Sequence, residues 1–278
     1  MIGVTGATGF IGSHLMNALG DFGFEIDLRN STNDELRAMI EGNNCNTIIH
    51  LANPTPSNYD DDYEKIKKEA RKLAERLVVI TESMQTIHII ALSSIRVYPN
   101  GLPVFTSKSL LNPIDDYGRG KVEMEDVFAS SKHRVTALRC SSVQGVGQDG
   151  SPRGIVGIFA KQFHENGLLS IMGDGLATKD LIHVENLVSL LVKISSMNIP
   201  ETDVFLPVGG GSSITVTTLA ELFTTGTDCK TETVEPAKYE LSGSVDNSEI
   251  MSYVDWSPTW TVEDMIDEAL NAMRGVMQ

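Results

Sequence analysis

The sequence predicts an open α/β fold, in which helices cover both faces of a mainly parallel sheet. The first sign is the opening stretch, where the apolar residues 2–4 lead into a turn with glycines at positions 6, 9 and 12 and then into a segment with helical apolar spacing. Continuous apolar runs and amphipathic segments then alternate up to about residue 140. Beyond that point the composition changes, which predicts a second, smaller unit.

Length and composition exclude several classes of protein. The 278 residues are enough for one large domain or two unequal ones. A formal net charge of −15 argues against a nucleic-acid partner, because phosphate binding needs a basic surface. Apolar runs are short and no secretory pattern opens the chain, so we expect no membrane span and a cytoplasmic location. Cys45, Cys140 and Cys229 lack metal-like spacing with histidines, so no metal site is expected.

The glycine turn predicts a dinucleotide site. Gly6 can take the positive φ of a sharp strand-to-helix turn, Gly9 allows a ligand to approach the backbone, and Gly12 allows close packing of the helix. The free N–H groups of the first helical turn then face a position where a pyrophosphate can accept from them. A purely structural turn is the alternative, because the spacing differs from the G-x-G-x-x-G fingerprint.

A second strand is expected at residues 23–29, with Asp27 at its end. Asp27 follows Gly6 by 21 residues, close to where a carboxylate meets the adenosine ribose of a bound dinucleotide. Arg29 would instead favour the 2′-phosphate of NADP. An acid that faces a phosphate is unfavourable, so we expect NAD and leave NADP as the alternative. Asp27 as a plain turn residue is the structural alternative.

The next segments continue the alternation. Helices are expected at 31–42, 60–84 and 112–130, and strands at 47–52, 87–94 and 135–140. The strand at 47–52 ends in Leu51 and Ala52, at the edge of the sheet where open α/β folds bind ligands. In the second half we expect a loop at 145–157, helices at 155–165, 187–195, 217–224 and 262–273, and strands at 169–172 and 204–208.

Three residues suggest alcohol and carbonyl chemistry. Tyr117 and Lys121 are spaced i, i+4 on one helical face, and the preceding strand ends in Ser94. Beside a nicotinamide, Tyr117 would exchange the hydroxyl proton and Ser94 would position the substrate oxygen. We expect the Lys121 ammonium to lower the pKa of the phenol. The Tyr-x-x-x-Lys spacing alone is common. It is informative here because it follows a strand that ends in Ser94, in a chain that opens with the glycine turn.

Five segments, in order along the chain, carry a resemblance to a known family. They are residues 5–12 (TGATGFIG), 93–98 (SSIRVY), 113–121 with Tyr117-x-x-x-Lys121, 138–147 (LRCSSVQGVG) and 173–184 (GDGLATKDLIHV). Together they resemble the extended short-chain dehydrogenase/reductases, which are NAD(P)-dependent epimerases, dehydratases and reductases acting mainly on nucleotide sugars. Residues 208–222 and 256–265 resemble late segments of the same family, so the likeness covers nearly the whole chain.

The resemblance implies a Rossmann-type doubly wound parallel sheet with a smaller C-terminal substrate-binding domain. We place the NAD(P)-binding domain at 1–148 and the mainly substrate-binding domain at 149–278, with segments near 178–195 and 203–208 returning to the Rossmann core. The catalytic residues would be Ser94, Tyr117 and Lys121. The cofactor contacts would be Gly6, Thr8, Gly9, Phe10, Ile11, Gly12, Asp27, Arg29, Leu51, Ala52, Tyr117 and Lys121. Substrate contacts would come from Ser94, Arg96, Ser142 and Lys179.

The chain departs from the family pattern at several points. Only one strand is expected between the first two helices, and the helix at 60–84 lacks the asparagine that often supports the lysine. Ile95 and Arg96 replace the acidic pair of sugar 4,6-dehydratases, which disfavours dehydration. Ser142 stands where relatives often have asparagine, and Lys179 replaces an arginine that contacts the pyrophosphate. Lys179 as a surface lysine is the structural alternative.

These features indicate a nucleotide-sugar 4-epimerase or a 4-keto-sugar reductase. The alternatives are a reductase of a non-sugar carbonyl on the same fold and a non-catalytic protein that senses NAD(P). The family resemblance also suggests a homodimer formed through the helices at 60–84 and 115–130.

Overall fold

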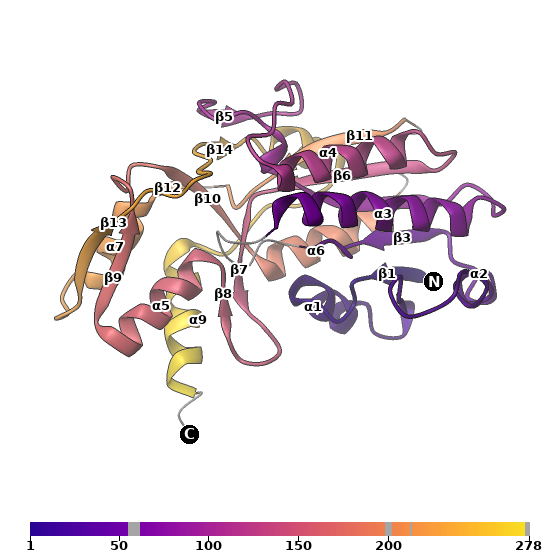
Figure 1. The fold of residues 1–278 in the computed structure, drawn as a ribbon. Helices are drawn as coiled ribbons and strands as arrows, with labels where there is room; N and C mark the ends of the chain where they lie inside the picture. The colour runs from indigo at the N-terminus through magenta and orange to yellow at the C-terminus, as the bar shows by residue number, and fades with distance from the viewer. Residues whose placement is uncertain (55–61, 198–201, 212, 276–278) are drawn as a thin grey trace.

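The computed structural model describes residues 1–54, 62–197, 202–211 and 213–275, and within these ranges a six-stranded parallel sheet forms the core (Figure 1). The strands lie in the order β11-β6-β4-β3-β1-β2. They are β1 (Ile2–Thr5), β2 (Gly23–Ile26), β3 (Thr47–His50), β4 (His88–Ser94), β6 (Arg134–Cys140) and β11 (Val204–Val208). The order reverses between β1 and β3, so the carboxyl ends of these strands flank the crevice where such sheets bind ligands.

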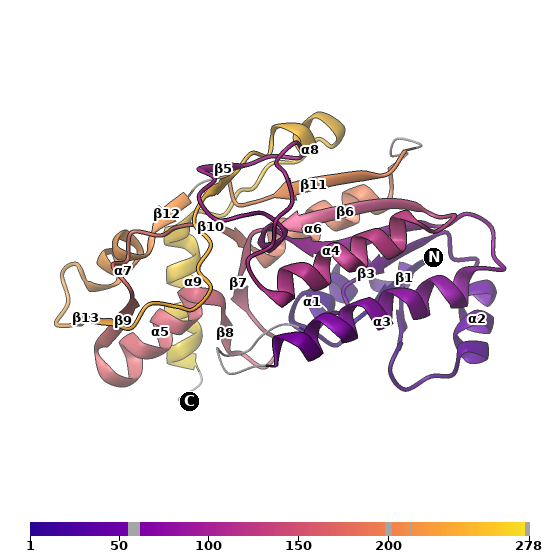
Figure 2. The same cartoon turned by 45° about the horizontal axis from the view of Figure 1, so that its top comes forward.

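Helices cover both faces of this sheet, which confirms the predicted doubly wound fold. One face packs against α1 (Phe10–Leu19) and α6 (Val184–Ser195), and the other against α2 (Asn33–Gly42), α3 (Tyr63–Thr81) and α4 (Asp116–Ala129). Figure 2 shows α3 and α4 side by side. The strands are apolar on both faces, as a sheet buried on both sides requires. Residues 60 and 61, where the long helix was predicted to begin, lie outside the described ranges.

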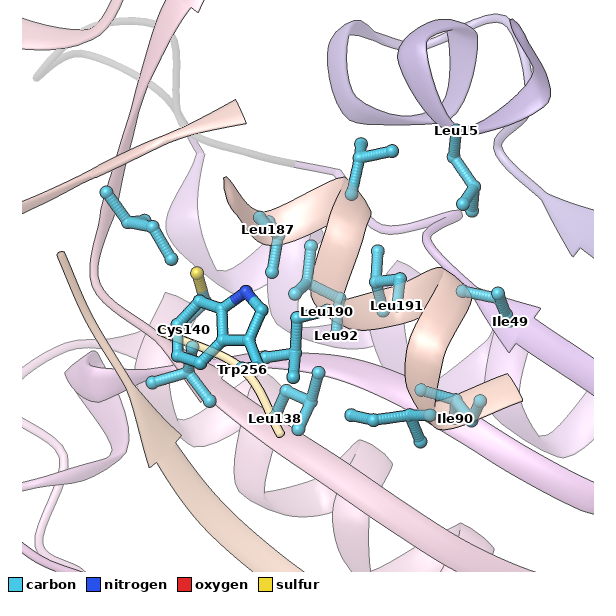
Figure 3. Close-up of a cluster of buried hydrophobic side chains, with 14 of the residues drawn as sticks. Leu15, Ile49, Ile90, Leu92, Leu138, Cys140, Leu187, Leu190, Leu191 and Trp256 are labelled. Carbon is cyan, nitrogen blue, oxygen red and sulfur yellow. The ribbon is translucent and has the colours of Figure 1, made fainter. Parts of the chain in front are cut away.

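The helical layer that contains α1 draws on the second half of the chain. In Figure 3, Leu187, Leu190 and Leu191 of α6 share one apolar cluster with Leu15 of α1 and Leu138 of the sheet. Trp256 closes one end of this cluster, where its indole N–H donates to the backbone oxygen of Asn186 at 3.0 Å. The layer on this face of the main sheet is therefore completed by residues far along the sequence.

The C-terminal half carries smaller sheets. One is formed by β7 (Ser142–Val146), β8 (Pro152–Arg153), β10 (Thr178–His183) and β12 (Ser213–Thr215). β9 (Leu168–Met172) pairs with β13 (Lys230–Val234), and β5 (Val104–Phe105) pairs with β14 (Ser244–Val245). The helices here are α5 (Gly154–Asn166), α7 (Val216–Thr224), α8 (Ser248–Tyr253) and α9 (Val262–Gly275). Helices α5, α7 and α9 share one apolar cluster.

Two local predictions were wrong. The first part of the loop predicted at 145–157 contains the end of β7 and the antiparallel strand β8, whereas α5 begins at Gly154, close to the predicted helix start at 155. The glycines there break the apolar period but permit a short hairpin. The strand predicted at 23–29 ends at Ile26, because Asp27 folds back on the following turn. β2 is the one strand between α1 and α2 in this fully described part of the chain, as the sequence indicated.

Candidate active site

The turn after β1 has the geometry expected from its glycines. Gly6 has a φ of +70°, and its backbone oxygen accepts from the N–H of Gly9 at 3.0 Å. A side chain at Gly12 would place Cβ 2.0 Å from that same oxygen, so only glycine lets α1 lie so close to the turn. A Cβ at Gly6 would lie 2.8 Å from the backbone nitrogen of Ala52, beyond the end of β3.

The start of α1 fits the pyrophosphate of a dinucleotide. No side chain caps the helix at Gly9, so the N–H groups of Phe10 and Ile11 are the donors at its free end. Thr8 and Gly9 are exposed, and a Cβ at Gly9 would meet only the Gly6 oxygen, at 3.3 Å. A phosphate can therefore approach this backbone.

Asp27 and Arg29 lie in the turn after β2. The Asp27 carboxylate accepts from the N–H of Arg29 at 2.9 Å and from the Asn30 side chain at 2.8 Å, and the Asn30 bond contributes most to lowering the pKa of Asp27. The exposed Arg29 guanidinium lies 3.9 Å from the Glu69 carboxylate. A 2′-phosphate in this turn would therefore meet two carboxylates beside one arginine.

Ser94, Tyr117 and Lys121 come together at the carboxyl end of β4. The Ser94 hydroxyl is one of the groups that lower the pKa of the Tyr117 phenol, and the Lys121 ammonium lies 5.6 Å from the centre of the Tyr117 ring. Lys121 also donates to the backbone oxygen of Leu92 at 2.8 Å. Gly118 makes this arrangement possible, since a Cβ there would lie 2.1 Å from the Arg96 backbone oxygen.

Burial governs the protonation of this group. It raises the pKa of Tyr117 to about 12, while the charge of Arg96 and the Ser94 hydroxyl act in the opposite direction. Burial also lowers the pKa of Lys121 to about 7, against the charge of Glu125. We expected Lys121 to lower the pKa of the phenol. The protein's own environment raises it instead, and the charge that most opposes the rise is Arg96.

Arg96 follows Ser94 in the short 3₁₀ helix η2 (Ile95–Val97). Its guanidinium donates to the buried carboxylate of Asp115 and lies 5.3 Å from the centre of the Tyr117 ring. On its other side it lies 5.8 Å from the ring of Tyr63 on α3, and that ring is 5.5 Å from Tyr239 of the C-terminal half.

A buried ion pair stabilises the same region from behind. Arg139 of β6 donates to Glu125 of α4 at 2.8 Å, and both side chains are almost completely buried. Ser93 donates to the same carboxylate, and Arg139 also donates to the Tyr98 hydroxyl. Sequence reasoning missed this network. The feature of the sequence that could have indicated it is Arg139, a charged residue inside the strand predicted at 135–140.

Ser142 and Lys179 lie on the second sheet. The Ser142 hydroxyl accepts from the Gln144 side chain at 2.8 Å. Lys179 forms an ion pair with Glu240 at 3.1 Å and donates to the backbone oxygen of Leu241. Within the described ranges, the side chains of Ser142 and Lys179 form their hydrogen bonds and ion pairs with residues of the C-terminal half.

The remaining candidate groups are structural. His183 caps α6, stacks on Trp260 with 3.5 Å between ring centres, and lies 3.0 Å from Glu268. Burial lowers the pKa of His50 to about 3. Among the residues that the structure describes, no three His, Cys, Asp or Glu side chains are grouped to hold a metal. No helix in that same part of the chain is long and apolar enough to cross a membrane.

A parallel sheet that reverses its order beside a glycine turn defines the class of Rossmann-type dinucleotide-binding proteins. Residues 2–205 match the model of a family described as the NAD dependent epimerase/dehydratase family. The chain belongs to this family, and it is an NAD-dependent enzyme of the extended short-chain dehydrogenase/reductase type.

Named relatives agree with this assignment. The chain is 24% identical to a putative UDP-glucose 4-epimerase of Methanocaldococcus jannaschii, over 99% of its own length and 98% of the relative. It is also 24% identical to a dTDP-L-rhamnose 4-epimerase of Burkholderia thailandensis, over 60% of the chain, and spans about half (48%) of that relative's length.

Solved structures share the fold across the whole chain. MoeE5, solved in complex with UDP-glucose and NAD, superposes with a TM-score of 0.85 at 21% identity and covers 100% of this chain and 99% of its own. A UDP-glucuronic acid 4-epimerase from Bacillus cereus, in complex with UDP-glucuronic acid and NAD, gives a TM-score of 0.87 at 18% identity and covers 99% of both chains. At these identities the likeness shows the fold.

Proposed function

We propose that this protein is a nucleotide-sugar 4-epimerase that uses Ser94, Tyr117 and Lys121. The observation that carries the proposal is the meeting of these three side chains at the carboxyl end of β4. Both named relatives are 4-epimerases, which supports the choice among reactions of the family. Ile95 and Arg96 offer no acid and base pair for the elimination of water, which argues against a dehydratase.

Each residue has a distinct task in this proposal. Tyr117 takes the proton from the sugar hydroxyl when the alcohol is oxidised and returns it when the ketone is reduced. Ser94 donates a hydrogen bond to the substrate oxygen and holds it beside the phenol. Lys121 contributes positive charge near the phenolate while it is protonated. The bound nicotinamide supplies the hydride chemistry.

We propose that the cofactor is held along the crevice between β1 and β3. Gly6, Thr8, Gly9, Phe10, Ile11 and Gly12 would surround the pyrophosphate, and Leu51 and Ala52 would line the opposite wall. Asp27 would accept from the adenosine, and Tyr117 and Lys121 would reach the nicotinamide end. The carboxylates of Asp27 and Glu69 near Arg29 would repel a 2′-phosphate, so they favour NAD over NADP.

The substrate contacts and the assembly are further parts of the proposal. Arg96 and Ser142 would face the sugar nucleotide, and Lys179 would approach its pyrophosphate only by giving up part of its pairing with Glu240. We keep the division into a cofactor domain at 1–148 and a substrate domain at 149–278. A homodimer formed through α3 and α4 would have twice the chain mass of 30.3 kDa in light scattering.

The test uses UDP-glucose, UDP-glucuronic acid and a dTDP-sugar, each mixed with the protein and NAD. We expect a C4 epimer of at least one of them, separated by chromatography. Tyr117→Phe should reduce turnover by about a hundredfold or more, because the general acid and base is lost. Tyr253→Phe, on the distant helix α8, is the matched control and should remain active. Full activity of Tyr117→Phe would refute the proposed mechanism.

A 4-keto-sugar reductase is the second outcome of the same test. In that case NADH absorbance would fall steadily with a 4-keto sugar nucleotide, whereas an epimerase exchanges isomers without net consumption.

A further inference from the structure

Arg96 occupies an unusual position beside the proposed catalytic phenol. Its guanidinium lies 5.3 Å from the centre of the Tyr117 ring and 5.8 Å from that of Tyr63, so it is packed between two aromatic side chains. A guanidinium at such distances is attracted to the ring faces. The side chain is 25% exposed, so its charge is only partly screened by solvent.

Asp115 fixes the guanidinium in this place. The carboxylate is fully buried, accepts from Arg96, and caps α4 by accepting from the N–H of Gly118 at 2.7 Å. The capped turn contains Tyr117, so one carboxylate holds both the arginine and the helical turn that presents the phenol. The Arg96 backbone lies against Gly118 as well. The geometry of Arg96 relative to Tyr117 is therefore set by side-chain and backbone contacts together.

The two cations near Tyr117 differ in how they respond to pH. Burial lowers the pKa of Lys121 to about 7, so its charge fades as the pH rises through neutrality. A guanidinium, by contrast, is a permanent cation. At neutral and alkaline pH a Tyr117 phenolate would thus have Arg96 as its steadily charged neighbour, because Lys121 is increasingly neutral there.

Other groups around the phenol do not supply this charge. Ser94 at the end of β4 contributes a neutral hydroxyl, and Tyr63 of α3 is also neutral. Burial raises the pKa of the Cys140 thiol on β6, so it stays protonated. Asp115 accepts from the Arg96 guanidinium, and the charge that lowers the pKa of Tyr117 is that of Arg96.

We propose that Arg96 is a positioning residue for Tyr117, and that its permanent charge stabilises the phenolate form of that side chain. The proposal rests on the proposed role of Tyr117, and it assigns a function to a residue that sequence reasoning placed only among substrate contacts. It also predicts that the pH range of the reaction depends on Arg96.

The test follows the ionisation of Tyr117 directly. Protein labelled with ¹³C at the tyrosine Cζ is titrated by NMR with saturating NAD, and Tyr117→Phe assigns the signal among the six tyrosines. In Arg96→Met we expect the midpoint to move up by about one pH unit, the lower end of the effect of a charge at this distance. Arg96→Lys keeps a positive charge and should titrate closer to the wild type than to Arg96→Met.

Two further variants serve as controls for the titration of Tyr117. Arg119→Met removes an exposed arginine from the same turn of α4, where it pairs with Asp116, and should leave the midpoint unchanged. Arg96→Met combined with Asp115→Asn leaves no unpaired buried carboxylate, and its midpoint should also rise, even if Arg96→Met alone fails to fold. Coinciding curves for the wild type and the Arg96 variants would overturn the proposal. Because no sugar is present, inactivity on every nucleotide sugar would refute the proposed function without affecting this result.

Discussion

At the scale of single residues, the site depends on polar groups whose pKa values are shifted by burial. Ser94, Tyr117 and Lys121 were predictable because each is marked by its place in a motif. The partners that set their charge were not. Asp115 and Arg96 are 19 residues apart, and Glu125 and Arg139 are 14 apart, and only the packing of α4 against η2 and β6 brings them together.

Lys121 gives a stability prediction whose sign follows from its pKa. The value is about 7 in the folded protein, against 10.5 for an unperturbed lysine. Between these two pH values the unfolded chain binds one proton more than the native protein, so unfolding becomes harder as the pH rises. The stabilisation is complete above 10.5 and is lost as the pH falls through 7.

We therefore expect the free energy of unfolding of the wild type, relative to Lys121→Met, to rise by about 1.4 kcal/mol per pH unit within this window. Urea denaturation at about pH 7.5 and about pH 9.5, without added cofactor, measures the difference. A difference that stays constant with pH would show that the ammonium group is hydrated in the folded protein.

At the scale of elements, prediction succeeded where a segment carries its own pattern. The helices α1, α2 and α4 and the strands of the main sheet were predictable from apolar spacing and capping residues. The short strands β5, β8, β12 and β14 were not, because two or three residues have no period of their own. β5 is extended because it pairs with β14, about 140 residues further along the chain. Such strands are defined by their partners.

The turn between β1 and α1 gives a prediction for a single element. Gly12→Ala would force Cβ against the Gly6 oxygen and push α1 off the turn, so we expect weaker NAD binding and a loss of about 2 kcal/mol or more of stability. Gly42→Ala, at the end of α2 where a Cβ meets nothing within 4 Å, is the matched control. It should stabilise the protein by up to about 1 kcal/mol. Calorimetry measures NAD binding and thermal unfolding measures stability for both variants. Equal NAD affinity and equal stability of Gly12→Ala and Gly42→Ala would contradict the close packing of α1 against the turn.

At the scale of the whole molecule, the main sheet and its helices are assembled from both ends of the chain. β11 extends the main sheet, and α6 with Trp256 completes the layer that contains α1, although all three follow residue 149. The contact between Tyr63 and Tyr239 joins the two halves again beside Arg96. A change in the C-terminal half can therefore reach the proposed site through packing.

The net charge predicts how anionic ligands arrive. At −15 the protein repels NAD and sugar nucleotides on average, and salt screens this repulsion. We expect the association rate of NAD to increase a few-fold between about 10 mM and about 150 mM salt, in stopped-flow fluorescence. A rate that falls with salt would mean that a local positive potential at the cleft outweighs the overall charge.

We propose that this protein oxidises and reduces C4 of a nucleotide sugar with its own Tyr117 as acid and base. The most direct measurement uses the nucleotide sugar that the protein converts, labelled with deuterium at C4 and incubated with NAD. We predict that the epimer retains the deuterium at C4 and that Tyr117→Phe forms it at least about a hundredfold more slowly. Loss of the label to solvent, or no conversion of any nucleotide sugar, would contradict the account.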